Sequence, residues 1–477
     1  MIEVRCFHSL VDAQPFRDAM DALNLASARP DPFSTFEFYA NHLRNAALIP
    51  AAAQPRLWLL LAFSEDQLVG YLALKLCRFR VLGLDAAKLD LLTAHKADRP
   101  HLVAEGDKLA AVRAAIYDYI LGRRKEWSLL EFQQQDAASA LLPLPLQMTS
   151  RVYSVQQWPN MDNGTIAIRW QSLAAYFAAL SKKSRSNVSR QMRTLLAAGD
   201  VQVLTSSDAQ TLPPLFELYR SVEANSWKAQ TDAAFASGNR WIEYYRGLMD
   251  RRQPMRVAIH VLLLDGVPIA GLITGAFGKG LYALHIVYDE RFSRLAPGSA
   301  ILLMGMRLAI EGGYGFFNLL QGFGYYKARW LAQMTETQSL QIYRVGTPFY
   351  WRRVLGDAKR RWFGRAVTGP PPLANPSRRA IAGDEPADPL ASRPPVVSPE
   401  EHAHCAALIA QVKRGHGEFL SSPQLVAALP FAAAIPTAAP KIQRMTSEAP
   451  ASPRAWNGYC APGTVVRPES VLDQGVL

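Results

Sequence analysis

The stretch "RVAIHVLLLDGVPIAGLITGAFGKGLYALHIVYDERFSRLAPGSAILLMGMRLAIEGGYGFFNLLQG", residues 256–322, decides the fold. It begins with two apolar runs joined by Asp265-Gly266, a dipeptide typical of two-residue hairpin turns. A third apolar run follows at 280–289, and then a segment with helical periodicity at 298–313. A last short apolar run, 316–322, ends the stretch. This order predicts an antiparallel meander, a helix and one further strand.

The same order of elements occurs earlier in the chain. Its parts are a hairpin at 58–76 with a polar turn at 64–67, a strand at 86–94, a helix at 106–127 and a strand at 128–134. Helical patterns precede the hairpin in both copies. A repeated supersecondary unit of this kind predicts two similar domains. We therefore expect an α/β (α+β) fold of two units, each a mixed, mostly antiparallel sheet flanked by helices.

The repeat also predicts the domain boundaries, which we place at 1–160, 161–355 and 356–477. Residues 369–477 contain 17 of the 32 prolines, and proline at this density disfavours helix and sheet. The last segment is therefore expected to be a basic amphipathic stretch followed by a largely disordered tail. One short helix is predicted within it, with Ser398 as N-cap and Pro399 in the first turn.

Charge and cysteine content limit the classes of function. Lys and Arg number 52 against 40 Asp and Glu, and the tail from residue 369 is neutral, so the surplus lies in residues 1–368. A basic folded part suits anionic ligands such as phosphates, nucleic acid or an acidic membrane surface. The four cysteines have neither disulfide-framework nor zinc-ligand spacing, which favours reduced thiols and a cytoplasmic protein. No signal peptide or membrane-spanning run is expected.

The strand-to-helix turn of the second copy suits a phosphate group. Pro297, Gly298 and Ser299 open the helix, and the first N–H groups of a helix lack partners within it. Together with the helix dipole they form a site for a pyrophosphate. Arg291 and Arg294 in the same loop could add charge-assisted contacts. The alternative is that Pro, Gly and Ser merely start the helix.

Four motifs in sequence order resemble one enzyme family. They are "SWKAQ" (226–230), "DGVPIAGLI" (265–273), "YDERFSRLAPGS" (288–299) and "LLQGFGYYKARW" (319–330). Together they resemble the tandem-GNAT acyltransferases, which include acetyltransferases associated with cellulose biosynthesis, and more distantly the Fem-type aminoacyltransferases of peptidoglycan. The resemblance covers about residues 1–355 and is strongest over 170–345. It implies two tandem GNAT units, acetyl-CoA or another acyl-CoA as donor, and no metal.

Two positions depart from the pattern of the family. The phosphate turn usually reads Arg or Gln, two residues, then Gly-x-Gly or Gly-x-Ala, whereas this chain has Pro297-Gly298-Ser299. Relatives often carry an Asp where this chain has Asn318. The first departure weakens the inference of acetyl-CoA as donor, and the second argues against a proton-transfer role at residue 318.

The resemblance implies direct attack of an amine or hydroxyl on a thioester, which needs a base and an acid. Asp289 is the first candidate for the base, with Glu223 and His285 behind it. Asp289 could instead cap a turn, and His285 could be a core histidine. Tyr325 or Tyr326 could protonate the leaving sulfur, although both could also be structural aromatics.

Three further residues are candidates for substrate binding. Trp227 and Lys228 follow the amphipathic segment before the second hairpin, and Lys327 follows two tyrosines. Trp227 could stack on a sugar or line an acyl channel, while Lys327 could bind a phosphate or a carboxylate. The first copy lacks all these motifs, so we expect it to bind no cofactor and to form one wall of the acceptor cleft.

Two basic segments leave rival functions open. Residues 181–193 could hold an anionic acceptor, the 3′-phosphate of CoA, or RNA; residues 350–366 alternate basic and aromatic residues as an interfacial helix does. The preferred hypothesis is an acyl-CoA-dependent acyltransferase acting on a small molecule or saccharide, in polysaccharide biosynthesis and in peripheral contact with an anionic membrane. The alternatives are a Fem-type enzyme that uses aminoacyl-tRNA, and a non-catalytic basic binding protein. No nucleic-acid-binding motif appears.

Overall fold

The structure is a computed structural model of the chain. It describes residues 2–46, 54–92, 98–142, 151–230, 239–250, 252–322, 327–362, 397–415 and 417–420. All of them lie in the first of the two compact units into which the chain divides, Met1–Ala432.

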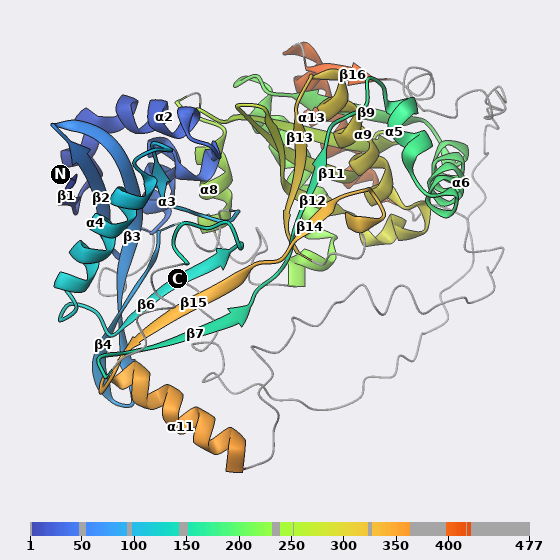
Figure 1. Cartoon of the computed structure of the whole chain (residues 1–477). Helices are drawn as coiled ribbons and strands as arrows, with labels where there is room; N and C mark the ends of the chain where they lie inside the picture. Colours follow the sequence, from blue (N-terminus) through green and yellow to red (C-terminus); the bar gives the residue numbers. More distant parts are fainter. Residues whose placement is uncertain are drawn as a thin grey trace. The chain divides into compact units, whose positions relative to one another are not determined.

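The first half is built on a sheet flanked by helices (Figure 1). Its strands lie in the order β1 (Ile2–Phe7), β2 (Arg56–Ser64), β3 (Gln67–Val81), β4 (Leu84–Leu91), β6 (Leu129–Gln135), β15 (Gln338–Arg344) and β7 (Tyr153–Pro159), with β5 (Val103–Ala104) paired to β3. The helical segments are α1 (Leu10–Ala13), η1 (Gln14–Phe16), α2 (Arg17–Ala26), η2 (Pro32–Ser34), α3 (Phe36–Ala46) and α4 (Leu109–Gly122). β4 and β6 are parallel neighbours, while the other listed neighbours of β3 and β6 pair antiparallel.

The second half contains a second sheet. Its order is β14 (Gln333–Thr335), β8 (Asn163–Ala167), β13 (Phe316–Gln321), β12 (Gly280–Tyr288), β11 (Val267–Phe277), β10 (Arg256–Leu264), β9 (Val201–Ser206) and β16 (Glu418–Leu420). Its helical segments are α5 (Leu173–Ala179), α6 (Lys182–Ala198), α7 (Leu212–Ala224), η5 (Trp227–Gln230), α8 (Asn239–Leu248), η7 (Glu290–Leu295) and α9 (Pro297–Glu311). Two more helices follow it in sequence, α11 (Pro348–Trp362) and α13 (Pro399–Arg414).

The two sheets repeat one topology, as the sequence predicts. The order β1-β2-β3-β4-β6 in the first matches β9-β10-β11-β12-β13 in the second. In each sheet the last two of these strands are parallel and are joined through a helix, α4 or α9. The fold is therefore α/β, with two tandem units of mixed, mostly antiparallel sheet.

The predicted hairpin turns form where the residue types allow them. Asp265 and Gly266 have φ values of 49° and 77°, and Glu65 and Asp66 have φ values of 50° and 62°. Two consecutive positive φ values match the twist of a tight hairpin. These turns set the register of β10 with β11 and of β2 with β3.

Two segments of the chain pass from one sheet to the other. β7 lies in the first sheet and β8 in the second, whereas β14 lies in the second and β15 returns to the first. β15 pairs with both β6 and β7, although it belongs by sequence to the predicted second domain, 161–355. Each sheet is thus completed by residues that the repeat itself does not include.

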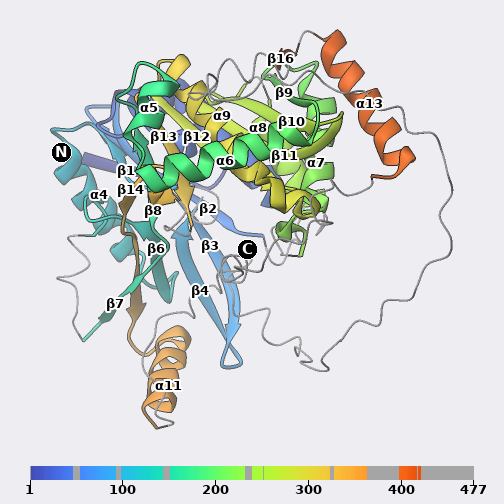
Figure 2. The same ribbon diagram turned by 90° about the vertical axis from the view of Figure 1, so that its right-hand side faces the viewer.

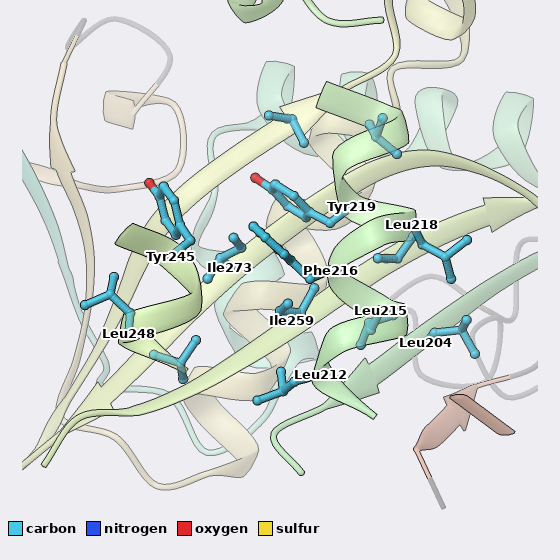
Figure 3. Packing of buried hydrophobic residues seen from close by; sticks show 14 of the residues in the cluster. Leu204, Leu212, Leu215, Phe216, Leu218, Tyr219, Tyr245, Leu248, Ile259 and Ile273 are labelled. Carbon is cyan, nitrogen blue, oxygen red and sulfur yellow. The ribbon is translucent and has the colours of Figure 1, made fainter. Parts of the chain in front are cut away.

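The core of the second half forms between α7 and the sheet (Figure 3). Leu215, Phe216 and Tyr219 of α7 are buried against Ile259 and Ile273. Gly271 allows this close approach, because a Cβ atom there would lie 2.4 Å from Cδ2 of Tyr219. The same cluster extends into the first half through Phe33 and Phe38 of η2 and α3, and the ring of Phe33 lies 5.7 Å from that of Tyr282.

The predicted helix of the tail is observed as α13. The hydroxyl of Ser398 accepts from the N–H of Glu401, and Pro399 occupies the first turn. Cys405, Ile409 and Val412 are buried in the core cluster that contains α7, and β16 extends the second sheet beside β9. Part of the region predicted to be largely disordered therefore belongs to the folded second half; the rest of that prediction concerns residues outside the described ones. Among the helices described, none is long and apolar enough to cross a membrane.

Candidate functional site

The second sheet opens between two of its parallel strands. β12 and β13 pair only from Gly280 to Tyr282 and from Phe316 to Asn318. Beyond this point β12 continues to Tyr288 without a partner on that side, while β13 turns to β8. Leu284, His285 and Ile286 are only partly buried, although β12 is a central strand. The sheet thus presents an unpaired strand edge at its centre.

The direction of the free backbone groups follows from the pairing with β11. The N–H of Asp289 donates to the carbonyl of Ile269, so this residue pair is hydrogen-bonded across the ladder. Hydrogen-bonded and non-bonded pairs alternate in an antiparallel ladder. The N–H and C=O groups of Ile286 and Tyr288 therefore point away from β11, into the opening between β12 and β13.

α9 begins beside the end of β12. Its N-cap, Ala296, has a left-handed backbone with φ of 51° and makes no side-chain cap. The N–H of Ser299 donates to the carbonyl of Ala296, and Tyr288 packs on Gly298, where a Cβ would lie 3.2 Å from the tyrosine ring. Pro297 is buried, whereas Gly298 and Ser299 are partly exposed. A helix start without a side-chain cap leaves the first turn suited to an anion.

Asp289 and Arg291 bind each other at this turn. The buried carboxylate of Asp289 accepts from the backbone N–H of Arg291 and from its guanidinium, with Nη2 to Oδ2 at 2.6 Å. Asp289 is also the N-cap of η7. Arg291 donates in addition to Glu401 of α13, at 2.8 Å. The geometry favours the capping alternative for Asp289, and it leaves Arg294, which is exposed, as the predicted arginine of this turn that is not bound to Asp289.

Other predicted residues come together on the α7 face of the sheet. Nδ1 of His285 lies 2.7 Å from the hydroxyl of Tyr219, and the ring of Tyr245 lies 5.5 Å from that of His285. Glu223 is buried one helical turn after Tyr219. Burial raises the pKa of both tyrosines, with the charge of Glu223 adding to the effect. We call Tyr219, Glu223, Lys228, Tyr245 and His285 the α7–β12 cluster.

Lys228 links this cluster to the open strand edge. Its Nζ donates to the carbonyl of Ile286 at 2.8 Å. Burial of the ammonium lowers the pKa of Lys228 to about 8, against a smaller opposite effect from Glu223. Trp227 is adjacent and 37% exposed, with Nζ of Lys228 5.9 Å from its ring centroid. Carboxylate, imidazole and a lysine with a lowered pKa therefore lie near the same stretch of β12.

Lys327 lies at the other side of the opening, in a polar network shared by both halves. Its Nζ donates to the carbonyl of Leu320 at 2.5 Å, and burial lowers its pKa to about 8. Asn318, where β12 and β13 part, donates to Asp98 of the first half at 2.7 Å. Asn163 of β8 also donates to Asp98. The first half thus places a buried carboxylate beside residue 318, the position at which relatives often have an acid.

The structure separates the predicted residues into groups. Glu223, His285 and Lys228 belong to the α7–β12 cluster, whereas Asp289 and Arg291 belong to the turn before α9. Tyr325 and Tyr326, predicted as acids, lie outside the described residues.

Sequence reasoning did not identify Tyr219, Tyr245, Asp98 or Glu401. The four-residue spacing of Tyr219 and Glu223 on one helix face was the available signal for the first of these. The other three depend on contacts between distant segments.

Two other observations limit the site. Within the described parts of the chain, no group of three or more His, Cys, Asp or Glu side chains could hold a metal ion. A hollow of about 520 Å³ lies between α7, α8 and α13, lined by residues that include Phe216, Arg246 and Leu408. It contains none of the predicted site residues apart from its shared use of α7.

Comparison with known sequences identifies one domain. Residues 182–328 match the family model described as an acetyltransferase (GNAT) domain. This range contains the α7–β12 cluster, the turn before α9 and Lys327. No curated protein sequence matches the chain.

Several solved structures have a similar arrangement at low sequence identity. The crystal structure of FemX has 9% identity and a TM-score of 0.49, and covers 70% of this chain and 97% of its own. A tandem GNAT protein from the clavulanic acid biosynthesis pathway has 12% identity and a TM-score of 0.40, with 73% and 99% covered. The C-terminal domain of a putative lysylphosphatidylglycerol synthetase from Agrobacterium fabrum has 13% identity and a TM-score of 0.42, with 68% and 96% covered. The chain therefore has two tandem GNAT-like units, and the second of them carries the match to the GNAT acetyltransferase domain.

Proposed function

We propose that this protein is an acyltransferase that moves an acyl group from acyl-CoA to an amine or hydroxyl. The observation that carries the proposal is the parting of β12 from β13 beside the first turn of α9, within the residues that match a GNAT domain. The opening offers unpaired backbone groups of Ile286 and Tyr288 to an extended, amide-containing donor. The helix start lies where its pyrophosphate would follow.

The donor's phosphates are assigned to the turn before α9. Gly298 and Ser299 supply N–H groups, and Arg294 supplies a guanidinium on the exposed side of the turn. Pro297 fixes the direction of the chain into the helix. Arg291 orders the turn through Asp289, and it reaches a phosphate only if Glu401 releases it.

The reaction forms a bond between the acceptor nitrogen or oxygen and the thioester carbonyl carbon, and it breaks the C–S bond. A base removes the acceptor's proton, and an acid returns a proton to the leaving thiolate. N–H groups of β12 that point into the opening are suited to the oxyanion that develops on the carbonyl. The products are the acylated acceptor and free CoA.

We assign the base to the α7–β12 cluster. Glu223 is a buried carboxylate near Lys228, whose ammonium bonds to β12, and His285 is held by Tyr219. Asp289 is less suited, because its carboxylate already accepts several bonds from Arg291. Tyr325 or Tyr326 remains the candidate for the acid.

The acceptor side of the proposal lies toward the first half. Trp227 is exposed enough to stack on a sugar, and Lys228 and Lys327 flank the opening with lowered pKa values. These residue types suit a saccharide or amino sugar acceptor. The proposed setting is polysaccharide biosynthesis in the cytoplasm, in peripheral contact with an anionic membrane through residues 350–366.

The first test is calorimetric titration of the full chain with CoA, acetyl-CoA and longer acyl-CoAs. The full chain is needed because α13 is part of the folded second half. Gly298→Asp should weaken binding at least about tenfold, since it places a carboxylate beside the pyrophosphate. Gly298→Ala controls for the tight contact with Tyr288, and Gly106→Asp adds the same charge where a new Cβ meets no atom within 4 Å.

The outcomes are distinct. Binding that is lost in Gly298→Asp but kept in both controls supports the proposal. Absence of binding to every acyl-CoA overturns it. Thiol release from the acyl-CoA that binds, measured with glucosamine as an amine probe, then tests transfer, and Glu223→Gln should reduce its rate by about 100-fold or more if Glu223 is the base.

A Fem-type aminoacyltransferase is the second candidate, and α6 is the observation that favours it. Lys182, Lys183, Arg190 and Arg193 are exposed on this helix, which contacts η7 and α9. Arg185 is different, because it donates to carbonyls of Ala178 and Leu180 at the end of α5. Binding of aminoacyl-tRNA without binding of acyl-CoA would favour this candidate.

A further inference from the structure

Helix α11 exposes an apolar stripe instead of burying it. Trp351 is 50% exposed and Leu355, four residues later, is 56% exposed. Residues four apart lie on one face of a helix, so the two side chains form one continuous apolar surface. Arg352 and Lys359 are exposed beside them. An apolar stripe bordered by cations is the pattern of a helix that lies in a membrane interface.

A second exposed apolar element lies at the same end of the first half. The hairpin between β3 and β4 turns at Leu82 and Gly83, with φ values of 53° and 77°. Leu82 is 54% exposed and Leu84 is 61% exposed. Arg78 and Arg80 are exposed on the strand that leads into the turn. Large aliphatic side chains at a hairpin tip cost free energy in water unless the tip has a partner.

The two elements are packed together. α11 contacts both β3 and β4, and the rings of Phe79 and Phe349 lie 5.9 Å apart in an edge-to-face arrangement. Figures 1 and 2 both show α11 beside the hairpin end of β3 and β4. The apolar stripe and the apolar tip therefore belong to one region.

The charge of this region indicates which partner it fits. Arg78, Arg80, Arg352, Arg353 and Lys359 face only two acids in the same segments, Asp85 and Asp357. Asp85 lies 3.8 Å from Arg80 and both are highly exposed, while Arg353 lies over the rings of Tyr343 and Tyr350. Apolar groups surrounded by a net positive charge are complementary to a bilayer that contains anionic lipids.

We propose that the β3–β4 hairpin and helix α11 form one composite surface that binds an anionic lipid membrane. Leu82, Leu84, Trp351 and Leu355 enter the interface between headgroups and acyl chains, and the basic residues contact lipid phosphates. Residues 350–366 alone suggest only a single amphipathic helix; the structure adds a second anchor on a different element. Two anchors fix the orientation of the protein on the membrane, whereas one helix would leave it free to rotate. This proposal does not depend on the acyltransferase reaction.

The test is co-sedimentation of the full chain with vesicles of phosphatidylcholine containing about 30% phosphatidylglycerol. Two paired variants, Leu82→Ser with Leu84→Ser and Trp351→Ser with Leu355→Ser, should each reduce the partition coefficient by about tenfold. The matched control is Val11→Ser with Leu25→Ser, because these residues are 81% and 51% exposed on α1 and α2. The control pair should bind as the unaltered protein does.

Further measurements keep the test sharp. Binding should fall when salt is raised from about 0.1 M to about 0.5 M, and pure phosphatidylcholine should bind weakly. Hydrogen exchange on vesicles should protect both the hairpin and α11, which also verifies that the variants are folded. No binding to anionic vesicles, or equal loss in the control pair, overturns the proposal. So does a concentration-dependent dimer that the same variants abolish, because the surface would then join two copies of this chain.

Discussion

At the scale of single residues, buried charge is the property that distinguishes this site. Lys327 is buried, and its ammonium has the carbonyl of Leu320 as one partner. Burying an ammonium group disfavours its charged form, which is why the pKa of Lys327 falls to about 8. A lysine of this kind carries a proton that it can lose near neutral pH, so it is suited to a site that handles protons.

The lowered pKa of Lys327 predicts a pH-dependent stability. The unfolded chain has a lysine pKa of about 10.4, so between about pH 8 and about pH 10.4 it binds more protons than the folded chain, and the free energy of unfolding rises with pH. Below about pH 8 both states are protonated and the cost of burying the charge is constant. Lys327→Met removes this cost, so its stability relative to the unaltered protein should be highest near neutral pH. Its relative stability should fall by about 2–3 kcal/mol toward about pH 10.

Urea unfolding of both proteins at several pH values in this range measures the difference. The lost bond to Leu320 adds a constant that does not depend on pH. Stability curves that remain parallel from neutral to alkaline pH would show that Lys327 has an ordinary pKa when folded.

At the scale of elements, the sequence predicted what local pattern determines. The paired hairpins, the helices after them and the N-cap at Ser398 all follow from short-range periodicity, turn residues and caps. The exchange of β7, β8, β14 and β15 between the sheets could not be predicted, because strand pairing between distant segments leaves no local signal. The same holds for the docking of α13, whose buried Cys405, Ile409 and Val412 lie in a region rich in proline.

The docking of α13 predicts that the tail stabilises the second half. Val412 is fully buried against the core cluster, so Val412→Ala should reduce the free energy of unfolding by about 1–3 kcal/mol. His404→Ala, on the exposed face of the same helix, is the control and should change stability by less than about 0.5 kcal/mol. Thermal unfolding of both variants checks the prediction, and equal midpoints for the two would show that α13 does not pack on α7 in solution.

At the scale of the whole molecule, the two halves of the repeat differ in role yet meet at one buried carboxylate. Asp98 of the first half accepts hydrogen bonds from Asn318 and Asn163 of the second, and Arg99 lies 3.4 Å from the same carboxylate. The sequence indicated only that the first copy lacks the motifs of the second. It could not indicate that a loop of the first copy supplies an acid to the place where β12 and β13 part, since that requires both sheets to be assembled.

This contact predicts that Asp98 joins the halves. Asp98→Leu leaves the amides of Asn163 and Asn318 and the guanidinium of Arg99 without their buried acceptor. Each such group costs about 1–3 kcal/mol, so the variant should lose at least about 2 kcal/mol of stability. Because Asn318 also accepts from the N–H of Leu320, at 2.8 Å, its displacement should loosen the mouth of the opening. Hydrogen exchange should therefore increase at β8 and at β13, which lie in the other half. Asp85→Asn, on the exposed hairpin, should leave both regions unchanged. An Asp98→Leu protein with altered exchange only around residue 98 would show that the two halves hold together without this carboxylate.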